Sequence, residues 1–403
     1  DFYHTYKEDL KLLADAGFKT FRTSLDWSRI FPNGDDEKPN EAALKHYDEM
    51  IDYMIKLGIE PIITMNHYET PINITLKYGG WPNKAVIPMF EKFGKVLLDR
   101  FGDRVKYWIV VNQINMVQIE PWLSVGVASD QYDNMQEALY QAMHNQFVAA
   151  AAIQKYAKSL HNPNLHIGTM VADGTVYPAS SKPDDIVLAM QQNRMQYFVT
   201  DVQFRGEYPK FALNYFADND IHLETTEEEL KLIKDNPMDF LAISYYYSKM
   251  VDSTKNEMQP ADTSDNPNLK QSDWGWAVDP QGLYNSLSQY YDSYQKPIII
   301  AENGFGAYDK LEDNHEVHDQ YRSDYLRAHI EQVGRAIHDG ADVIAYCAWG
   351  PIDIVSCSSQ QMSKWYGFIY VDLDDEGKGS GKRYLKDSYN WYKNVISSNG
   401  AEI

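Results

Sequence analysis

The chain has 403 residues, a formal net charge of −21, 44% hydrophobic residues and 13% aromatic residues. This length suits one large domain or two ordinary ones, and the acidic balance argues against nucleic acid and anionic membrane surfaces as partners. No apolar run is long enough to span a bilayer, and Cys347 and Cys357 are too few for a disulfide framework, so we expect a cytoplasmic enzyme.

Strand-like and helix-like runs alternate along nearly the whole chain. A helix over 3–17 precedes a strand over 18–25, and a helix over 41–58 precedes a strand over 60–68. Asn40 can cap the second of these helices. The later strands are predicted over 105–112, 165–173, 239–247, 297–304 and 342–350, and the later helices over 84–102, 135–160, 320–340 and 387–398.

Seven strands with helices between them, each apolar enough to be buried on both faces, predict a parallel sheet. No glycine-rich dinucleotide fingerprint follows a strand, which disfavours a nucleotide-binding open sheet. A (β/α)8 TIM barrel fits better, but it needs eight strands, and seven would leave open edges. We therefore expect a single barrel domain over 1–403, N-terminally incomplete, whose first strand lies upstream. The polar segment 249–275 is expected to be a loop over one barrel face.

Polar residues recur at the carboxyl ends of the predicted strands, where barrels of this class build their sites. Each alone has an ordinary explanation, such as a strand-to-helix turn, but the repetition favours an active site. In chain order, these ends hold Arg22, "NHY" (66–68), "NQIN" (112–115), Asp173, "SYYY" (244–247), "ENG" (302–304) and "WGPID" (349–353).

Glu302 follows the wholly apolar "PIIIA", where a carboxylate is costly to bury unless something requires it. Arg22, pointing into the same funnel, would hold it ionised. An ionised, oriented carboxylate with no metal cluster nearby suggests a covalent nucleophile, and a structural ion pair is the alternative. A retaining glycosidase needs a second carboxyl group about 5 Å away. Position 113 is in the right place, but it is Gln.

Six stretches carry the pattern of a known family. They are "FRTSLDWSRIFPNG" (21–34), "NHYETP" (66–71), "YGGW" (78–81), "FGDRVKYWIVVNQIN" (101–115), "IIIAENGFG" (298–306) and "YGFIYVD" (366–372). In this order they resemble glycoside hydrolase family 1, the β-glucosidase family, along the length of the chain. The resemblance implies a (β/α)8 barrel whose opening strand, absent from this sequence, carries a sugar-binding Gln.

The resemblance also implies a role for individual residues. Glu302 matches the nucleophile, and position 113 matches the acid/base, which the family carries as Glu. Asn112 would bind the sugar 2-hydroxyl, and His67 the 3-hydroxyl side of the glycone. The other implied contacts are Arg22 and Tyr246 to the nucleophile, Trp349 under the glycone ring and Trp276 at the cleft entrance.

The sequence departs from ordinary β-glucosidases after the last predicted strand. Those enzymes carry a Glu-Trp pair there for the glycone 4- and 6-hydroxyls, whereas Ser356 and Cys357 stand in its place, followed by Lys364 and Tyr366. This resembles the 6-phospho-β-glycosidase branch, in which a Ser, a Lys and a Tyr bind the sugar 6-phosphate. A Glu would repel a phosphate dianion, while lysine supplies a cation and tyrosine a hydroxyl donor.

The expected substrate is a small phosphorylated β-glucoside, such as cellobiose 6-phosphate or a phosphorylated aryl glucoside. Cys357 is small and leaves room for an equatorial 4-hydroxyl, which favours 6-phosphoglucosides over 6-phosphogalactosides; the second class stays open as an alternative. Such substrates come from phosphotransferase uptake and exist inside the cell. No cofactor or metal is expected, and the sequence is silent on the oligomeric state.

Gln113 raises a further alternative. A carboxamide cannot give a proton to the leaving oxygen, so general acid help worth about 100-fold or more is lost. The chain is either a hydrolase with its acid/base replaced, an isosteric change of the kind made to trap a substrate, or a natural pseudoenzyme that binds sugar phosphates. We favour the first because the rest of the site is intact. Glu120 and Asp173 are weaker candidates for the missing acid.

Overall fold

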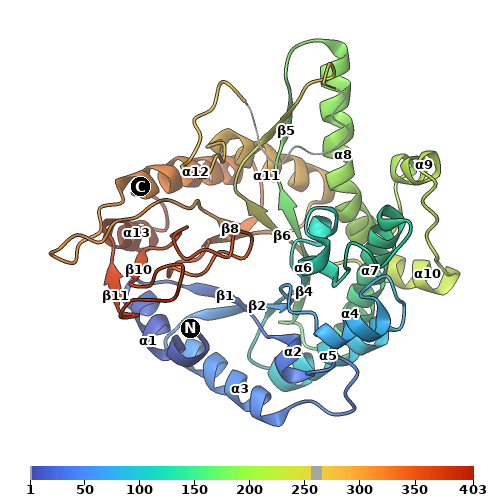
Figure 1. Cartoon of the computed structure of the whole chain (residues 1–403), viewed down its shortest axis with the longest axis horizontal. Coiled ribbons are helices and arrows are strands. Elements are labelled where there is room, and N and C mark those ends of the chain that lie inside the picture. Colours follow the sequence, from blue (N-terminus) through green and yellow to red (C-terminus); the bar gives the residue numbers. More distant parts are fainter. Residues whose placement is uncertain (1, 256–265) are drawn as a thin grey trace.

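The computed structural model describes residues 2–255 and 266–403. Seven parallel strands form one sheet that curves into a nearly closed barrel with helices outside it (Figure 1). This arrangement confirms the predicted (β/α)8 TIM barrel class, and each of the seven predicted strands is present. In order across the sheet they are β1 (Thr20–Ser24), β2 (Glu60–Asn66), β3 (Tyr107–Val111), β4 (His166–Asp173), β6 (Phe240–Tyr245), β8 (Ile298–Asn303) and β9 (Val343–Ala348).

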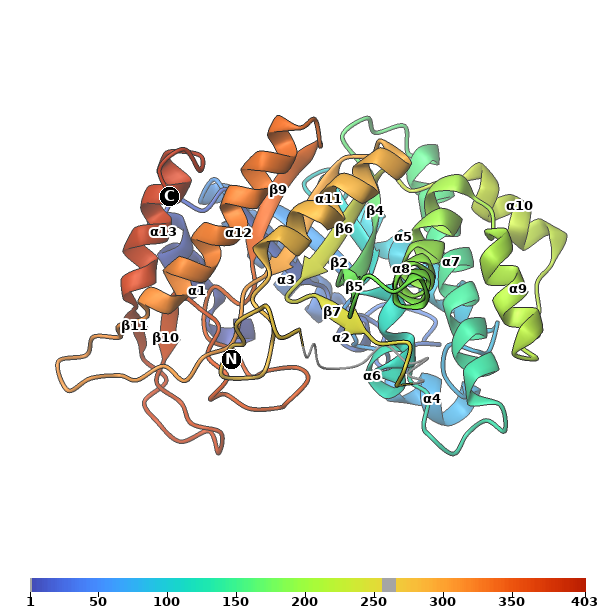
Figure 2. The same ribbon diagram turned by 90° about the horizontal axis from the view of Figure 1, so that it is seen from above.

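The helices follow the predicted pattern, and Figure 2 shows them packed along the outside of the strands. Asn40 caps α3 as expected, since its side-chain oxygen accepts a hydrogen bond of 3.1 Å from the backbone of Ala42. None of the helices in the described ranges is both long and apolar enough to cross a membrane. The helices are α1 (Phe2–Asp15), α2 (Trp27–Ile30), α3 (Glu41–Lys56), α4 (Ile72–Tyr78), α5 (Val86–Phe101), the 3-10 helix η1 (Ile114–Gln118), α6 (Pro121–Val125), α7 (Met135–Ser159), α8 (Pro183–Arg205), α9 (Lys210–Asp218), α10 (Glu227–Asp235), α11 (Pro280–Tyr294), α12 (Gln320–His338) and α13 (Asp387–Ser397).

Two short pairs of strands lie outside the barrel sheet. The antiparallel pair is β10 (Ile369–Val371) with β11 (Arg383–Leu385), and the parallel pair is β5 (Val176–Pro178) with β7 (Lys249–Val251). The prediction of a loop over 249–275 is therefore wrong at its start, because β7 obtains its hydrogen bonds from β5. Residues 256–265 of that predicted loop lie outside the described residues.

The barrel interior has its own small apolar core, separate from the larger core between strands and helices. The side chains that fill the interior come from five strands and are Ile62, Ile109, Met170, Phe240, Ala242, Ile299 and Ala301. Branched and aromatic side chains thus close the centre of the barrel, as the class requires. The site is consequently confined to the ends of the strands.

The strands β1 and β9 form the two ends of the sheet, and in the part of the chain that the structure describes they do not pair with each other. A cavity of about 1060 Å³ is lined by both strands together with α12 and α13. The prediction that every strand is buried on both faces is wrong for these two, as the 43% exposure of Ile344 shows. Each lacks a neighbour on one side. A first strand upstream of this sequence stays a prediction.

Gly168 in β4 tests how tightly the barrel interior is packed. A Cβ atom at this position would lie 2.4 Å from ring carbons of Phe240. We expect Gly168→Ala to lower the free energy of unfolding by about 1–3 kcal/mol, because the ring has to move within a packed core. Urea unfolding measures the change.

Gly334 supplies the matched control for this substitution. It lies inside α12, and among the described residues no atom lies within 4 Å of a Cβ built there. Gly334→Ala should raise the free energy of unfolding by about 0.5–1 kcal/mol, because alanine favours the helix. Shifts of the same sign and size in both variants would contradict the packing described for the barrel interior.

Candidate active site

Glu302, in β8, lies at the centre of the site with only 2% of its surface exposed. The Arg22 guanidinium, from β1, donates through Nη1 to Oε1 of Glu302 at 2.5 Å. The Tyr246 hydroxyl, directly after β6, donates to Oε2 at 2.7 Å. Burial and the neighbouring Glu302 carboxylate raise the pKa of Tyr246 well above its usual range, so the hydroxyl keeps the proton that it donates. The carboxylate is therefore held at both oxygens.

Gln113 follows β3 and faces Glu302 directly. Its Nε2 donates to Oε2 of Glu302 at 3.3 Å and to the Ser244 hydroxyl at 2.6 Å, and the Tyr68 hydroxyl donates to its Oε1. Gln113 has φ +40° and Tyr68 has φ +72°, a backbone region that side chains other than Asn, Asp and Gly rarely adopt. Strain of this kind persists where the surrounding structure holds it, typically at functional sites.

The direct contact between Gln113 and Glu302 limits the reaction stereochemistry. A 3.3 Å bond from Nε2 to Oε2 means that the two side-chain carbons are at most about 5.9 Å apart, from standard C–N and C=O bond lengths. Retaining glycosidases place their two carboxyl groups about 5–5.5 Å apart, whereas inverting enzymes need about 6.5–9.5 Å to admit a water molecule between them. With a carboxyl group at position 113, the geometry suits retention.

Asn112 and His67 provide polar groups beside Glu302. Arg22 donates through Nη2 to Oδ1 of Asn112 at 2.7 Å, while Nδ2 of Asn112 is buried and has no well-formed hydrogen bond within the described residues. Burial and the positive charge of Arg22 lower the pKa of His67 well below its usual range, so the imidazole is neutral. Its ring lies 6.0 Å from that of Trp349.

Lys364, 4% exposed, forms the positive part of the site. Its ammonium group lies 4.1 Å from the ring centre of Trp276 and 5.0 Å from that of Trp274, and no ion pair with a carboxylate is found within the described ranges. Burial lowers its pKa to about 8. The hydroxyls of Ser356 and Tyr366 lie 3.3 Å apart, and both residues are buried. A buried cation without a counter-ion, near two hydroxyls, suits an anionic ligand.

A cavity of about 960 Å³ joins these two parts of the site. Arg22 and Asn112 are not among its lining residues, and Arg22 donates to both Glu302 and Asn112. Every other predicted site residue lines the cavity, namely His67, Gln113, Tyr246, Trp276, Glu302, Trp349, Ser356, Cys357, Lys364 and Tyr366.

Three further residues of the site were not among those predicted. Tyr68 and Ser244 hold the Gln113 amide, and Trp274 lies beside the Lys364 ammonium group. The signal for the first two was their position in "NHY" and "SYYY" at strand ends. Their contact with Gln113 depends on how strands distant in the sequence meet, which no local pattern indicates.

The two weaker candidates for the missing acid, Glu120 and Asp173, also line the cavity. The Asp173 carboxylate accepts hydrogen bonds from Ser286 and from Tyr290, the latter at 2.9 Å, both on α11. Neither candidate has a hydrogen bond to Glu302 in the described part of the chain, whereas Gln113 does. Position 113 thus remains the best-placed partner of Glu302. Within the described residues, no group of three or more His, Cys, Asp or Glu side chains could hold a metal ion.

Comparison with known proteins gives one consistent family. Residues 1–401 match the description "Glycosyl hydrolase family 1". The aryl-phospho-beta-D-glucosidase BglH of Bacillus subtilis (strain 168) is 45% identical over 408 residues, which cover 100% of this chain and 87% of the relative. The 6-phospho-beta-glucosidase of Clostridium longisporum is 44% identical over 413 residues, with 100% and 87% covered.

A solved structure agrees with these sequence relatives. The family 1 b-glucosidase from Thermotoga maritima superposes with a TM-score of 0.89 at 30% sequence identity, covering 100% of this chain and 88% of that one. The barrel, the contact between Glu302 and position 113, and the full-length relatives agree: the chain belongs to glycosyl hydrolase family 1.

Proposed function

We propose that the chain is a retaining 6-phospho-β-glucosidase in which Gln113 replaces the acid/base. It hydrolyses 6-phospho-β-D-glucosides to glucose 6-phosphate and the aglycone, slowly because Gln113 cannot transfer the proton. The observation that carries the proposal is that one cavity joins the Glu302–Gln113 pair to the ammonium group of Lys364, which has no carboxylate partner in the described part of the chain. Relatives that bear the name 6-phospho-beta-glucosidase support the substrate class. The substrate arises inside the cell, so the proposed location is the cytoplasm.

The reaction has two displacements at the anomeric carbon. In the first, a carboxylate oxygen of Glu302 forms a bond to this carbon while the bond to the leaving oxygen breaks, which gives a covalent glycosyl-enzyme. In the second, water attacks the same carbon and releases Glu302. A Glu at position 113 would protonate the leaving oxygen in the first step and take a proton from water in the second. Gln113 keeps the shape of this group and loses both transfers.

The glycone is bound beside Glu302 by three side chains. Nδ2 of Asn112, a donor with no well-formed hydrogen bond among the described residues, binds the sugar 2-hydroxyl, neutral His67 binds the 3-hydroxyl side, and Trp349 lies under the ring. Hydrogen bonds to the 2-hydroxyl strengthen in the transition state of glycosidases, so Asn112 contributes to rate as well as binding.

The 6-phosphate is bound by Lys364, Ser356 and Tyr366. Burial raises the pKa of Tyr366 to about 12, so its hydroxyl stays protonated and can donate to phosphate. The stretch 356–366 contains no Asp or Glu that would repel the dianion. Small Cys357 leaves room for an equatorial 4-hydroxyl, which supports glucosides rather than galactosides.

A second candidate function is sugar-phosphate binding without catalysis. The specific observation in its favour is Gln113, which removes the proton donor from an otherwise complete site. The two candidates differ in what happens when that donor is restored.

Restoring the carboxyl group by Gln113→Glu should raise the rate of hydrolysis of p-nitrophenyl 6-phospho-β-glucoside by about 100-fold or more, because the general acid and base return. The gain should be larger for cellobiose 6-phosphate, whose poor leaving group needs the proton more. Steady-state rates of p-nitrophenol or glucose 6-phosphate release provide the measurement.

Adding Glu302→Gln to the Gln113→Glu chain is the control and should abolish the gain. An unchanged rate after Gln113→Glu would refute the acid/base assignment and favour the binding-only candidate. Faster cleavage of the 6-phosphogalactoside than of the 6-phosphoglucoside would move the substrate to the galactoside class.

Lys364→Ala should weaken binding of glucose 6-phosphate by about 10- to 100-fold, the range expected for a charge-assisted hydrogen bond, and leave binding of glucose unchanged. Calorimetric titration measures both affinities. Lys378→Ala is the control, because this lysine is exposed and pairs with Glu376 outside the cavity. Equal losses for the two ligands would remove the phosphate role from Lys364.

Phosphate affinity should also depend on pH in a defined direction. Because the pKa of Lys364 is about 8, raising the pH through this value removes its positive charge in the free protein, whereas the phosphate dianion forms above about pH 6. Glucose 6-phosphate affinity should therefore be highest between about pH 6 and pH 8 and fall at higher pH. Calorimetric titrations across this pH range test the prediction. In Lys364→Ala the affinity for glucose 6-phosphate should not fall above pH 8. A constant affinity well above pH 8 in the unchanged chain would contradict the role of Lys364 in binding phosphate.

A further inference from the structure

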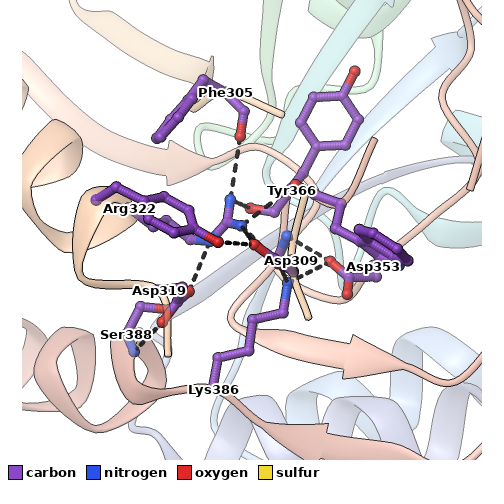
Figure 3. A network of polar contacts seen from close by, with 11 residues as sticks. Phe305, Asp309, Asp319, Arg322, Asp353, Tyr366, Lys386 and Ser388 are labelled. Carbon is purple, nitrogen blue, oxygen red and sulfur yellow. Dashed lines mark hydrogen bonds and ion pairs between the residues drawn. The ribbon is translucent and has the colours of Figure 1, made fainter. Parts of the chain in front are cut away.

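Five charged side chains are buried together behind the loop that follows β9 (Figure 3). None has more than 5% of its surface exposed, and with two positive and three negative charges they form what we call the charged network: Asp309, Asp319, Arg322, Asp353 and Lys386. The loop of residues 353–367, which we call the phosphate loop, carries the residues proposed to bind the 6-phosphate.

Arg322, in α12, is the centre of the charged network. Its Nη2 donates to both carboxylate oxygens of Asp309 at 2.9 and 2.8 Å, and its Nε donates to Asp319 at 2.9 Å. Lys386 connects Asp309 to Asp353, whose Oδ1 accepts from its ammonium group at 2.9 Å. Burying so many charges gives little net stability, since desolvation offsets the attraction between them. What the network provides is a fixed geometry.

The network fixes one peptide group of the phosphate loop from both sides. Nη1 of Arg322 donates to the carbonyl oxygen of Tyr366 at 2.6 Å, and the N–H of Gly367, on the other side of the same peptide bond, donates to Asp353 at 2.8 Å. Because a peptide group is planar, fixing both its polar atoms sets its plane. This in turn fixes the position of the Tyr366 Cα atom, from which the side chain leaves the backbone.

The same guanidinium connects the phosphate loop to the segment that follows β8, the strand that carries Glu302. Nη1 of Arg322 also donates to the carbonyl oxygen of Phe305 at 3.2 Å, three residues after Glu302. A Cβ atom at Gly306 would lie 2.5 Å from the Lys364 side chain, so the two loops are in close contact. One buried cation is therefore hydrogen-bonded both to the segment after Glu302 and to the loop that carries the proposed phosphate-binding groups.

We infer that the charged network is a positioning device that sets selectivity for phosphorylated over plain glucosides, through Arg322 above all. This inference rests on the phosphate role proposed for Ser356, Lys364 and Tyr366. A glucoside 6-phosphate has a fixed distance between its anomeric carbon and its phosphorus, and supporting groups of this kind hold binding side chains to within about 0.5 Å of the productive geometry. A plain glucoside makes no use of the phosphate loop and is indifferent to its position.

Arg322→Lys tests the inference, because lysine keeps the charge and loses the planar fork of donors. The ligands are p-nitrophenyl β-glucoside and its 6-phosphate, which the Gln113 chain cleaves slowly enough to titrate by calorimetry. We expect affinity for the phosphorylated ligand to fall by about 10-fold or more and affinity for the plain ligand to stay within about 2-fold. Asp319→Asn keeps the shape of the side chain and weakens its hydrogen bond with Arg322. It should give a smaller loss of affinity that is again confined to the phosphorylated ligand. If Arg322→Lys does not fold, Asp319→Asn provides the test.

Arg383→Lys is the matched control. Arg383 donates to Asp9 at 2.8 and 2.9 Å in another largely buried ion pair and makes no side-chain hydrogen bond to the phosphate loop among the described residues, so its replacement should lower the unfolding midpoint without changing the ratio of the two affinities. The inference would be overturned if the ratio of the affinity for the phosphorylated ligand to that for the plain ligand stayed unchanged in Arg322→Lys and Asp319→Asn, whether or not both affinities fell.

Lys364→Ala, titrated in parallel, separates this inference from the proposed function. If Lys364→Ala lowers the ratio while the network variants do not, the phosphate pocket stands and the charged network has no part in selectivity. If Lys364→Ala itself leaves the ratio unchanged, the proposed phosphate pocket fails.

Discussion

The ion pair between Arg22 and Glu302 joins β1 to β8, two strands that are not neighbours in the sheet. A carboxylate buried without a partner costs several kcal/mol, so Glu302 can lie at the end of its apolar strand only where the curvature of the barrel brings a cation to it. The other guanidinium nitrogens of Arg22 donate hydrogen bonds to Asn112 and Thr64. A single guanidinium thus contacts the proposed nucleophile, the amide proposed for the 2-hydroxyl and Thr64 of β2.

The cavity separates two kinds of charge that match the two ends of the proposed substrate. At one end, Glu302 faces the carbon that gains positive charge in the oxocarbenium-like transition state. At the other end, the ammonium group of Lys364 lies over the ring of Trp276 and has no carboxylate partner in the described chain, so it can pair with a dianion. The net charge of −21 gives no hint of this positive pocket, because local burial and pairing decide what a site binds. The buried Arg322 links the two ends, so catalysis and phosphate selectivity share one rigid frame.

Apolar runs and strand-end polar residues predicted the seven strands and where the site lies, because both patterns are local. The partial exposure of β1 and β9 was not predictable, because it depends on which strands lie beside them. The strand β7 was not predicted, because it lies in a polar segment and its partner β5 is distant in sequence. The roles of individual side chains came from the family resemblance. Tyr68 and Ser244 form hydrogen bonds with Gln113 from distant parts of the sequence, so no local motif predicts these contacts. The same is true of the charged network.

In the proposed mechanism, Glu302 forms a covalent bond to the glycone and Gln113 blocks the proton transfers around it. The direct test uses 2,4-dinitrophenyl 6-phospho-β-glucoside, whose leaving group needs no acid, so the first displacement proceeds while the second lacks its base. Mass spectrometry of the protein should show one added 6-phosphoglucosyl group, and peptide mapping should place it on Glu302. No adduct, or an adduct on another residue, would contradict the role of Glu302 as the nucleophile.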